Sequence, residues 1–332
     1  MKPYIYFNGL LELAKIINGT ERIHVGIRPY GFHAGNAMAM VVYPYLLCKY
    51  VESLGKVASF TFIVSINDWE QDALDGPNPR KYPFNVYPRN TSIFYLQDAK
   101  GCCESATDHW QPVIERNLNG LKVKYPRITF KYIRNSELIK HSFCRYLLSR
   151  TIMNPMEQFN ILVTNSHFSY LNYPIKYAGA ICPKCHTAHG VTTVVNHDKI
   201  LWDCSKCHLT ITDNTHKFQY WWYHKPMLIA RIKIFDIDIT LSGGDHYSEG
   251  DFSIRKAFIE KYIPTIREPY MLFTPTIISP DGQKMSKSRN NTEYANIPKL
   301  IKYSDKFMGH ELKLSNKLIE NIVDEKYYCY IL

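Results

Sequence analysis

The sequence contains no run of 18 or more apolar residues, which excludes a membrane-spanning helix. The N-terminus also lacks the pattern of a secretory signal peptide, because Asn8 and Glu12 interrupt its apolar stretch and no small-residue cleavage site follows. Internal repeats and low-complexity linkers are absent too. We therefore expect a chain without a membrane partner and without a repeat architecture.

Cysteines are few as well, since nine occur in 332 residues. Four of them form two CxxC pairs, and the other five, which we interpret as free thiols, are Cys48, Cys102, Cys103, Cys144 and Cys329. This number and this clustering exclude a disulfide framework. The cysteine usage predicts a cytoplasmic protein.

Acidic residues are outnumbered by basic ones, 30 to 40, and the net charge is +10. A basic balance fits an anionic partner such as tRNA or ATP. The apolar fraction of 45% is enough to bury a sizeable core, and the length allows one to three domains.

Short apolar runs rich in Ile, Val, Phe and Tyr alternate with segments of helical spacing. The runs predict buried strands at 23–27, 57–65, 128–133, 234–241 and 270–274. The helical spacing predicts helices at 37–54 (interrupted at Pro44), 105–118, 254–262, 297–303 and 312–323. Strands that alternate with helices predict an α/β fold with a doubly wound parallel sheet.

The segment 178–214 follows neither period and is rich in Cys, His, Thr and Asp. Its two CxxC pairs, Cys182/Cys185 and Cys204/Cys207, enclose 18 residues, and this spacing brings four thiolates to one tetrahedral zinc ion. The residues 191–195 can form a short hairpin. We predict a structural zinc ribbon; the alternatives are unrelated thiols, a redox pair, or ligation by His186, His189 or His208.

The segment after the first predicted strand has the features of a phosphate-binding turn. Pro29 and Gly31 favour a tight strand-to-helix turn, and Gly35 permits a nucleotide to approach the backbone. The N-terminus of the following helix suits phosphate, and His33 can donate to a phosphoryl oxygen. A purely structural turn is the alternative when the segment is taken alone.

Two further segments carry similar chemistry. Lys284 and Lys287, in the string Lys-Met-Ser-Lys-Ser, can neutralise the β- and γ-phosphates of ATP as pyrophosphate leaves. The string 243–246, Gly-Gly-Asp-His, follows a predicted strand, where ligands bind in doubly wound sheets. In it, Asp245 could accept from ribose hydroxyls.

Together these segments resemble the class I aminoacyl-tRNA synthetases. The string 33–36, His-Ala-Gly-Asn, looks like the HIGH signature of that family, and 284–288 is an intact KMSKS signature. The resemblance narrows to the class I, archaeal type of lysyl-tRNA synthetase through Gly26-Ile-Arg-Pro-Tyr-Gly31, Asn67-Asp-Trp-Glu70, Gly101-Cys-Cys-Glu-Ser105 and the stretch that begins at His224. It covers about residues 20–292.

The resemblance implies a Rossmann-like catalytic domain that forms an aminoacyl adenylate from ATP, with Mg²⁺ alongside, and transfers the acyl group to tRNA. It implies catalytic roles for His33, Asn36, Lys284 and Lys287. The implied ATP-binding residues are Pro29, Gly31, His33, Gly35, Asn36, Gly243, Gly244, Asp245, His246, Lys284, Met285, Ser286 and Lys287. The implied amino-acid-binding residues are Gly26, Arg28, Asp68, Glu104 and His224.

The implied domain order is a first catalytic part at 1–177, the zinc ribbon at 178–214, a second catalytic part with the KMSKS loop at 215–292, and a short helical segment at 293–332. The family carries a large anticodon-binding region after KMSKS, so we expect a catalytic core without that region. Arg28 and Lys225 stand where a pocket for the lysine ammonium needs acids or aromatic faces. The alternatives are therefore a paralogue that activates another amino acid for a biosynthetic or modification pathway, and a non-catalytic RNA-binding paralogue.

Overall fold

The computed structural model describes the following residues of the chain: 5–7, 9–29, 34–57, 59–69, 91–154, 157, 160–161, 164, 179–187, 190–196, 199–214, 217–218, 220–221, 224–243, 246, 251–274, 277–278, 301 and 330–331. Within these residues, none of the helices has the length and apolar character needed to cross a bilayer.

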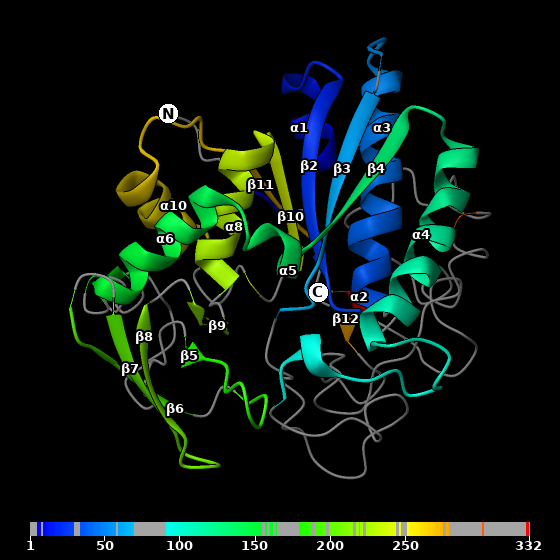
Figure 1. Ribbon diagram of the computed structural model, residues 1–332. Coiled ribbons are helices and arrows are strands. Elements are labelled where there is room, and N and C mark those ends of the chain that lie inside the picture. The colour runs from blue at the N-terminus through cyan, green and yellow to red at the C-terminus, as the bar shows by residue number, and fades with distance from the viewer. Residues whose placement is uncertain are drawn as a thin grey trace.

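A six-stranded parallel sheet forms the centre of the molecule (Figure 1). Its order is β1 (Ile5–Phe7), β11 (Tyr270–Thr274), β10 (Ile239–Gly243), β2 (Thr20–Ile27), β3 (Ser59–Ile66) and β4 (Ile128–Arg134). Every pairing is parallel. From β2 the chain builds outward through β3 to β4, and it returns to the other side of β2 with β10 and β11. This reversal confirms the predicted doubly wound sheet and places its switch point between β2 and β10.

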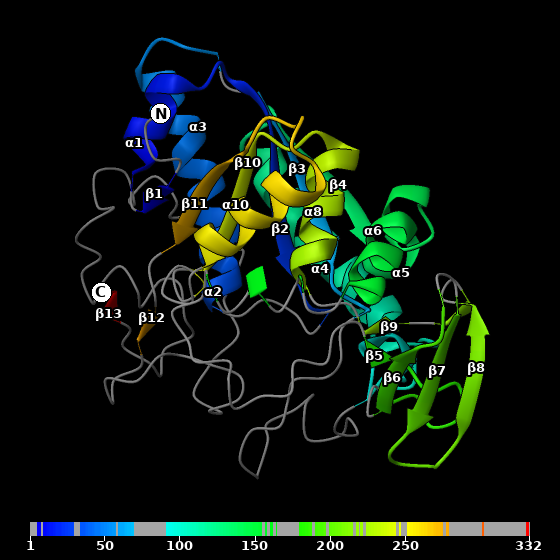
Figure 2. The same cartoon turned by 90° about the vertical axis from the view of Figure 1, so that its left-hand side faces the viewer.

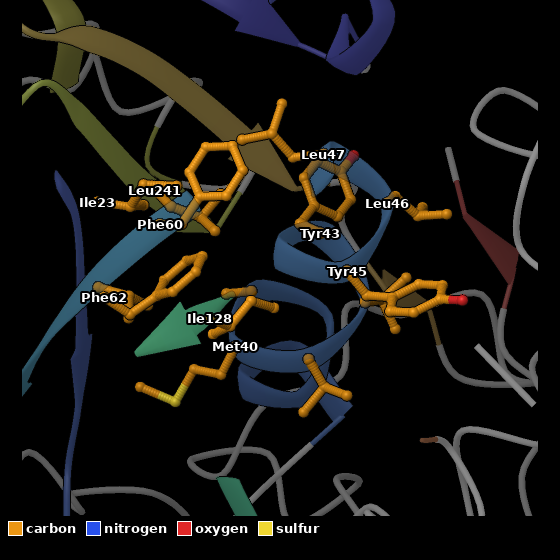
Figure 3. Packing of buried hydrophobic residues seen from close by; sticks show 14 of the residues in the cluster. Ile23, Met40, Tyr43, Tyr45, Leu46, Leu47, Phe60, Phe62, Ile128 and Leu241 are labelled. Carbon is orange, nitrogen blue, oxygen red and sulfur yellow. The ribbon is translucent and has the colours of Figure 1, made fainter. Parts of the chain in front are cut away.

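Helices cover both faces of the sheet (Figure 1). The first face carries α1 (Leu10–Ile16), α3 (Tyr43–Ser53) and α4 (Ala106–Lys124), whose buried side chains form one apolar cluster with β2 and β3. Figure 3 shows part of this cluster, in which Phe60 and Phe62 of β3 lie close to Tyr43 and Met40. The second face carries α6 (Ser142–Met153), α8 (His224–Phe235) and α10 (Asp251–Tyr262), which form a second cluster. Short α5 (Asn135–Leu138) follows β4 directly.

The predicted interruption of the helix at 37–54 has a clear physical cause. The segment consists of α2 (Ala34–Ala37), a π-helical turn η1 (Met38–Val42) and then α3, and Pro44 lies in the first turn of α3. Proline lacks an N–H group, and its ring collides with the carbonyl four residues earlier in a regular α-helix. The wider π-turn accommodates the ring at this point.

The strand predicted at 234–241 is wrong in its first half. Helix α8 continues to Phe235, and β10 begins only at Ile239. The chain reverses at Asp236, which has a φ of 49°. The apolar residues of the last turn of α8 and those of β10 follow one another closely in the sequence. The apolar pattern therefore placed the start of the strand too early. Helices α1 and α6 and strand β1 were not predicted.

A separate antiparallel sheet lies away from the parallel sheet, at the foot of α6 in Figure 1. It consists of β6 (Gly190–Val194), β7 (Lys199–Cys204) and β8 (Thr210–Asn214). Strand β6 pairs with β7 from Gly190 to Val194, which confirms the predicted hairpin at 191–195. Strands β5 (Gly179–Ala180) and β9 (Tyr220–Trp221) pair with each other and bring the two ends of this insertion together. Trp202 of β7 is fully buried and provides much of its small core.

A last pair of strands joins two distant parts of the chain. Strand β12 (Ile277–Ile278) follows β11 and pairs with β13 (Tyr330–Ile331), as Figure 2 shows. The helices predicted at 297–303 and 312–323 lie outside the described residues, except for Ile301, which is helical.

Candidate adenylate site and cysteine cluster

The carboxyl ends of β2 and β10 lie side by side at the switch point of the sheet. Their register pairs Ile239 with Ile23 and Thr240 with His24, so Gly243 of β10 lies level with Ile27 of β2. In open α/β sheets this edge is the place where nucleotides and substrates bind. The fold therefore brings together the ends of β2 and β10, although more than 200 residues separate the two strands in sequence.

Five of the predicted ATP-binding residues lie in the described part of this edge. Pro29 is buried, and Asn36, Gly243 and His246 are half-buried. Gly35 is exposed in α2, and a Cβ added to it would meet no described atom within 4 Å. The others lie outside the described residues and stay predictions: Gly31, His33, Gly244, Asp245, Lys284, Met285, Ser286 and Lys287.

The predicted amino-acid-binding residues are spread over the same edge. Gly26 faces the Asn67 side chain, and a Cβ on Gly26 would lie 3.1 Å from Asn67 Nδ2. Arg28 is half-buried, and Glu104 is exposed in the loop before α4. His224 begins α8, but its side chain lies outside the described residues.

Asp68 has a partner in the protein that sequence reasoning did not foresee. Its side chain is buried, and it accepts from the Ser136 backbone N–H at 3.0 Å and from the Ser136 hydroxyl at 2.5 Å. Burial raises the pKa of Asp68, and the two bonds from Ser136 oppose this effect. These contacts join the end of β3 to the beginning of α5.

A buried polar cluster lies just below this edge, and the sequence did not reveal it. Arg231 of α8 is 4% exposed, and its Nη2 donates to Asn135 Oδ1 at 2.6 Å. Asn135 Nδ2 donates in turn to Asn67 Oδ1 at 3.1 Å. Arg231 Nη1 lies 3.3 Å from His24 Nε2, which lies 2.9 Å from Ser65 Oγ. The local signal was the presence of a polar residue within each apolar run, His24 in β2 and Ser65 in β3.

A second buried arginine supports the end of β10. Arg255 of α10 donates from Nη1 to Thr240 Oγ1 at 2.8 Å and from Nη2 to Ser242 Oγ at 2.7 Å. Burial lowers the pKa of Arg255. Burial, with Arg231 and Arg255 nearby, lowers the pKa of His24 well below its usual range. Two guanidinium groups therefore place positive charge below the edge at which the substrates of this fold bind.

The four cysteines of the CxxC pairs converge at the base of the antiparallel sheet. Cys182 Sγ lies 3.5 Å from Cys207 Sγ, Cys185 Sγ lies 3.5 Å from Cys204 Sγ, and all four sulfurs lie within 4.8 Å of one another. Tetrahedral zinc with bonds of about 2.3 Å places its sulfur ligands about 3.8 Å apart. The donor set and its spacing fit zinc.

The backbone of both pairs has the geometry of a metal knuckle. The Cys185 and Cys207 N–H groups each point at the first sulfur of their own pair, at 3.5 Å. The next residues, His186 and His208, have φ of 57° and 56°, so each knuckle closes with a left-handed residue. The His186 ring stacks on Tyr95 at 4.0 Å, and neither histidine belongs to the group of converging ligand atoms. His189, the third alternative ligand, lies outside the described residues.

Two thiols of the cluster differ in pKa. Burial raises the pKa of Cys182 to about 12. Burial would also raise the pKa of Cys185, but contacts with the Thr187 hydroxyl and with the sulfurs of Cys204 and Cys182 hold it at about 7.

The first knuckle contacts the catalytic part of the chain. Besides the stack on Tyr95, the His186 carbonyl accepts from the Ser92 N–H at 3.3 Å, and Thr187 forms a bridge with Thr91. The segment 91–96 thus connects the ribbon to the loop that leads into α4.

The sequence matches the family described as tRNA synthetases class I (K) over residues 14–305, which is most of the chain. The chain belongs to this class I tRNA synthetase family. The enzymes of this family are aminoacyl-tRNA ligases, and the parallel sheet is their Rossmann-like core. The predicted family is thereby confirmed. The match does not reach the narrower prediction of a lysyl-tRNA synthetase. A comparison with curated proteins found no match.

Solved structures to which the chain is similar include aminoacyl-tRNA synthetases. Tyrosyl-tRNA synthetase from Archaeoglobus fulgidus, in complex with L-tyrosine, matches 85% of this chain and 62% of its own, with 15% identity and a TM-score of 0.41. Tryptophanyl-tRNA synthetase from Campylobacter jejuni matches 92% of this chain and 67% of its own, with 14% identity and a TM-score of 0.38. A tyrosyl-tRNA synthetase from Leishmania major matches with 14% identity and a TM-score of 0.41, and the chain covers 30% of that protein. The chain also spans less than two thirds of the length of the Archaeoglobus protein.

Proposed function

We propose that the chain activates an amino acid with ATP and passes the aminoacyl group to the acceptor end of a tRNA in the cytoplasm. The observation that carries this proposal is the pairing of β2 with β10. In the sequence, β2 precedes the HIGH-like string and β10 leads into the string 243–246. Such an edge, with phosphate-binding strings on both adjoining segments, fits a nucleotide that lies across the switch point.

In the proposed reaction the amino-acid carboxylate attacks the α-phosphorus of ATP, a new C–O–P linkage forms, and pyrophosphate leaves. The attacking group is already an anion, so the step needs no general base. Positioning and charge stabilisation then supply the rate enhancement. We assign the phosphate contacts to His33, Asn36, Lys284 and Lys287, with Mg²⁺ on the phosphates, and the ribose contact to Asp245. A tRNA hydroxyl then attacks the acyl carbon, and AMP leaves.

The charge below the edge supports anionic substrates. Arg231 and Arg255 are buried beneath β2 and β10 and both impose a positive field on His24. Low-dielectric surroundings strengthen such fields, because water does not screen them. The positive field favours the carboxylate and the phosphates that meet in this reaction.

The identity of the activated amino acid is a separate point, and one observation favours an amino acid other than lysine. Asp68, the acid that the resemblance assigns to the pocket, is buried and accepts twice from Ser136. Arg28 and Arg231 add cations to the same region. A lysine ammonium needs an acid or an aromatic face. The second candidate is therefore a paralogue that activates a neutral or acidic amino acid.

Zinc is assigned a structural role. Cys182, Cys185, Cys204 and Cys207 would hold the ion, and four thiolates leave no open coordination position for catalysis. Zinc would add to the small apolar core around Trp202, and it would hold the first knuckle against Tyr95.

The test is amino-acid-dependent ATP–pyrophosphate exchange over a panel that contains lysine and the other standard amino acids. We expect exchange with one of them. Exchange with lysine would identify a lysyl-tRNA synthetase, and exchange with another amino acid would support the second candidate. Absence of exchange with every amino acid, in a folded and zinc-loaded protein, would overturn activation.

Transfer is tested separately with the labelled amino acid that gives exchange. Label that reaches total tRNA supports the ligase. Label that stays in the adenylate while exchange is active contradicts tRNA transfer and supports the biosynthetic alternative.

A further inference from the structure

Asn67 lies directly after β3, at the carboxyl edge of the parallel sheet and next to the end of β2. Its backbone N–H donates to the Ile27 carbonyl at 2.7 Å, which extends the pairing of β2 with β3 by one bond. Its half-buried side chain lies over Gly26, because a Cβ on Gly26 would be 3.1 Å from Asn67 Nδ2. The absence of a side chain at Gly26 therefore provides the space in which the Asn67 amide lies.

The orientation of the Asn67 amide follows from the groups behind it. Arg231 Nη2 donates to Asn135 Oδ1 at 2.6 Å and lies 3.4 Å from Asn67 Oδ1. A guanidinium group has donors only, so both amide oxygens must face Arg231. Asn135 Nδ2 then donates to Asn67 Oδ1 at 3.1 Å. A flip of either amide would set a donor against a donor, and Asn67 Nδ2 is therefore turned away from Arg231.

The groups that hold this amide are well fixed. Asn135 is 3% exposed and Arg231 is 4% exposed, so neither side chain has room to change its rotamer freely. The residue that follows Asn67 is also held, because the Asp68 carboxylate accepts from the N–H and the hydroxyl of Ser136. The Asn67 side chain therefore loses little conformational freedom when it binds a further group, and such preorganisation increases affinity.

The Asn67 nitrogen retains its donors for a bound molecule. Among the residues that the structure describes, none accepts from Asn67 Nδ2, and the side-chain contacts of Asn67 are made by its oxygen. The sequence predicts that Gly26, below this nitrogen, and Asp68, the next residue, bind the amino acid. Asn67 Nδ2 therefore presents an unused donor in the region where we expect the amino-acid substrate.

We infer that Asn67 determines specificity for an amino acid whose side chain ends in an acceptor oxygen, that of a carboxylate or a carboxamide. This inference rests on the proposed activation of an amino acid. The Asn67 NH₂ group donates to such an oxygen, whereas a lysine ammonium has donors only and would face it without an acceptor. Asp68, the adjacent acid, already accepts twice from Ser136. The buried charge of Arg231 favours a carboxylate over a carboxamide.

The nearest alternative is that Asn67 Nδ2 binds a group that all amino acids share, the α-carboxylate. Replacement of Asn67 would then lower the activation of every amino acid by the same factor. A contact with the substrate side chain predicts instead that the ratio between two substrates changes. The comparison of two substrates therefore separates specificity from general binding.

The first experiment measures kcat/KM of ATP–pyrophosphate exchange for aspartate, glutamate, asparagine, glutamine, lysine and leucine. In the wild type, one of the first four should exceed lysine by roughly 100-fold or more, and Asn67→Asp, which replaces the NH₂ group by a carboxylate oxygen of the same size, should lower this ratio by roughly 100-fold. The matched control is Asn119→Asp, the same change at an exposed position of α4, which should keep the ratio. A preference for lysine or leucine, or an unchanged ratio in Asn67→Asp, would overturn the inference and leave amino-acid activation intact.

A second measurement does not depend on activation. Isothermal titration calorimetry of the full chain, without ATP, gives its affinity for the same six amino acids. We expect one of the first four to bind best, and Asn67→Asp to weaken its binding by about tenfold or more. Gly26→Ala, whose Cβ would lie 3.1 Å from Asn67 Nδ2, should weaken it too and replaces the first variant if that one misfolds. Best binding of lysine or leucine, or binding of none of the six, would refute the inference, whereas binding of an acceptor-ended amino acid without any exchange would refute activation alone.

Discussion

Lowering the pH from 7.5 to 5.5 should destabilise the wild type more than a His24→Gln variant. His24 is 6% exposed, and its Nε2 lies 3.3 Å from Arg231 Nη1. A guanidinium can only donate, so Nε2 must accept and the folded imidazole is neutral, with its proton on Nδ1. Burial first, and then the charges of Arg231 and Arg255, lower the pKa of His24 well below 6.5.

The magnitude follows from proton linkage. In the unfolded chain His24 takes up a proton near pH 6.5, whereas the folded chain resists it, so the folded pKa is the lower one. The stability associated with the neutral form is complete above pH 6.5 and is lost as the pH falls below it. Far below pH 6.5 the cost approaches about 1.4 kcal/mol for each pH unit, and integration from pH 7.5 to 5.5 gives a total of about 1.4 kcal/mol.

Urea denaturation followed by tryptophan fluorescence measures this effect at pH 7.5, 6.5 and 5.5. Glutamine keeps an acceptor for Arg231 and does not titrate, so the stability advantage of the wild type over His24→Gln should shrink by about 1.4 kcal/mol across this range. The control is Ile23→Val, a neighbouring buried change without a titratable group, whose cost of about 0.5–1.5 kcal/mol should be the same at each pH. A constant gap between wild type and His24→Gln would refute the assignment of a neutral, buried His24.

Three further predictions concern the ribbon and the site. Gly190→Ala should lower the free energy of unfolding by about 1–3 kcal/mol or more in urea denaturation, because the new Cβ would lie 2.5 Å from the Asp203 carbonyl oxygen. The control Gly120→Ala in α4 should change the free energy of unfolding by less than about 1 kcal/mol. Chelation should unfold the ribbon, seen as loss of amide-exchange protection in β7; full protection without metal would contradict a structural zinc. Lys284→Ala should lower the rate of pyrophosphate exchange by roughly 100-fold or more. The control Lys122→Ala changes an exposed residue in the last turn of α4 and should leave the rate unchanged. Equal exchange rates of Lys284→Ala and the wild type would contradict a role of Lys284 in stabilising the transition state.

Local sequence determined much of this protein. The strands 23–27 and 270–274 were predictable because apolar residues alternate in the first, at Ile23, Val25 and Ile27, and form a short run in the second. The CxxC spacing predicted the convergence of four sulfurs, since each pair forms its own knuckle before the two meet. The resemblance to the family, too, was visible in short strings and their order along the chain, and the family match over residues 14–305 agrees with it.

Only the tertiary structure decided which distant side chains meet. Arg231 contacts Asn135 and His24 because α8 packs across the ends of strands that are far from it in sequence. The periodicity of the sequence does not predict this contact. Cys102 and Cys103, interpreted as free thiols, gain Asp98 and His109 as neighbours only when the loop folds over the start of α4. Spacing along a chain reports the local helix or strand period, whereas contacts between elements depend on sheet order and on packing, which are set by the whole core.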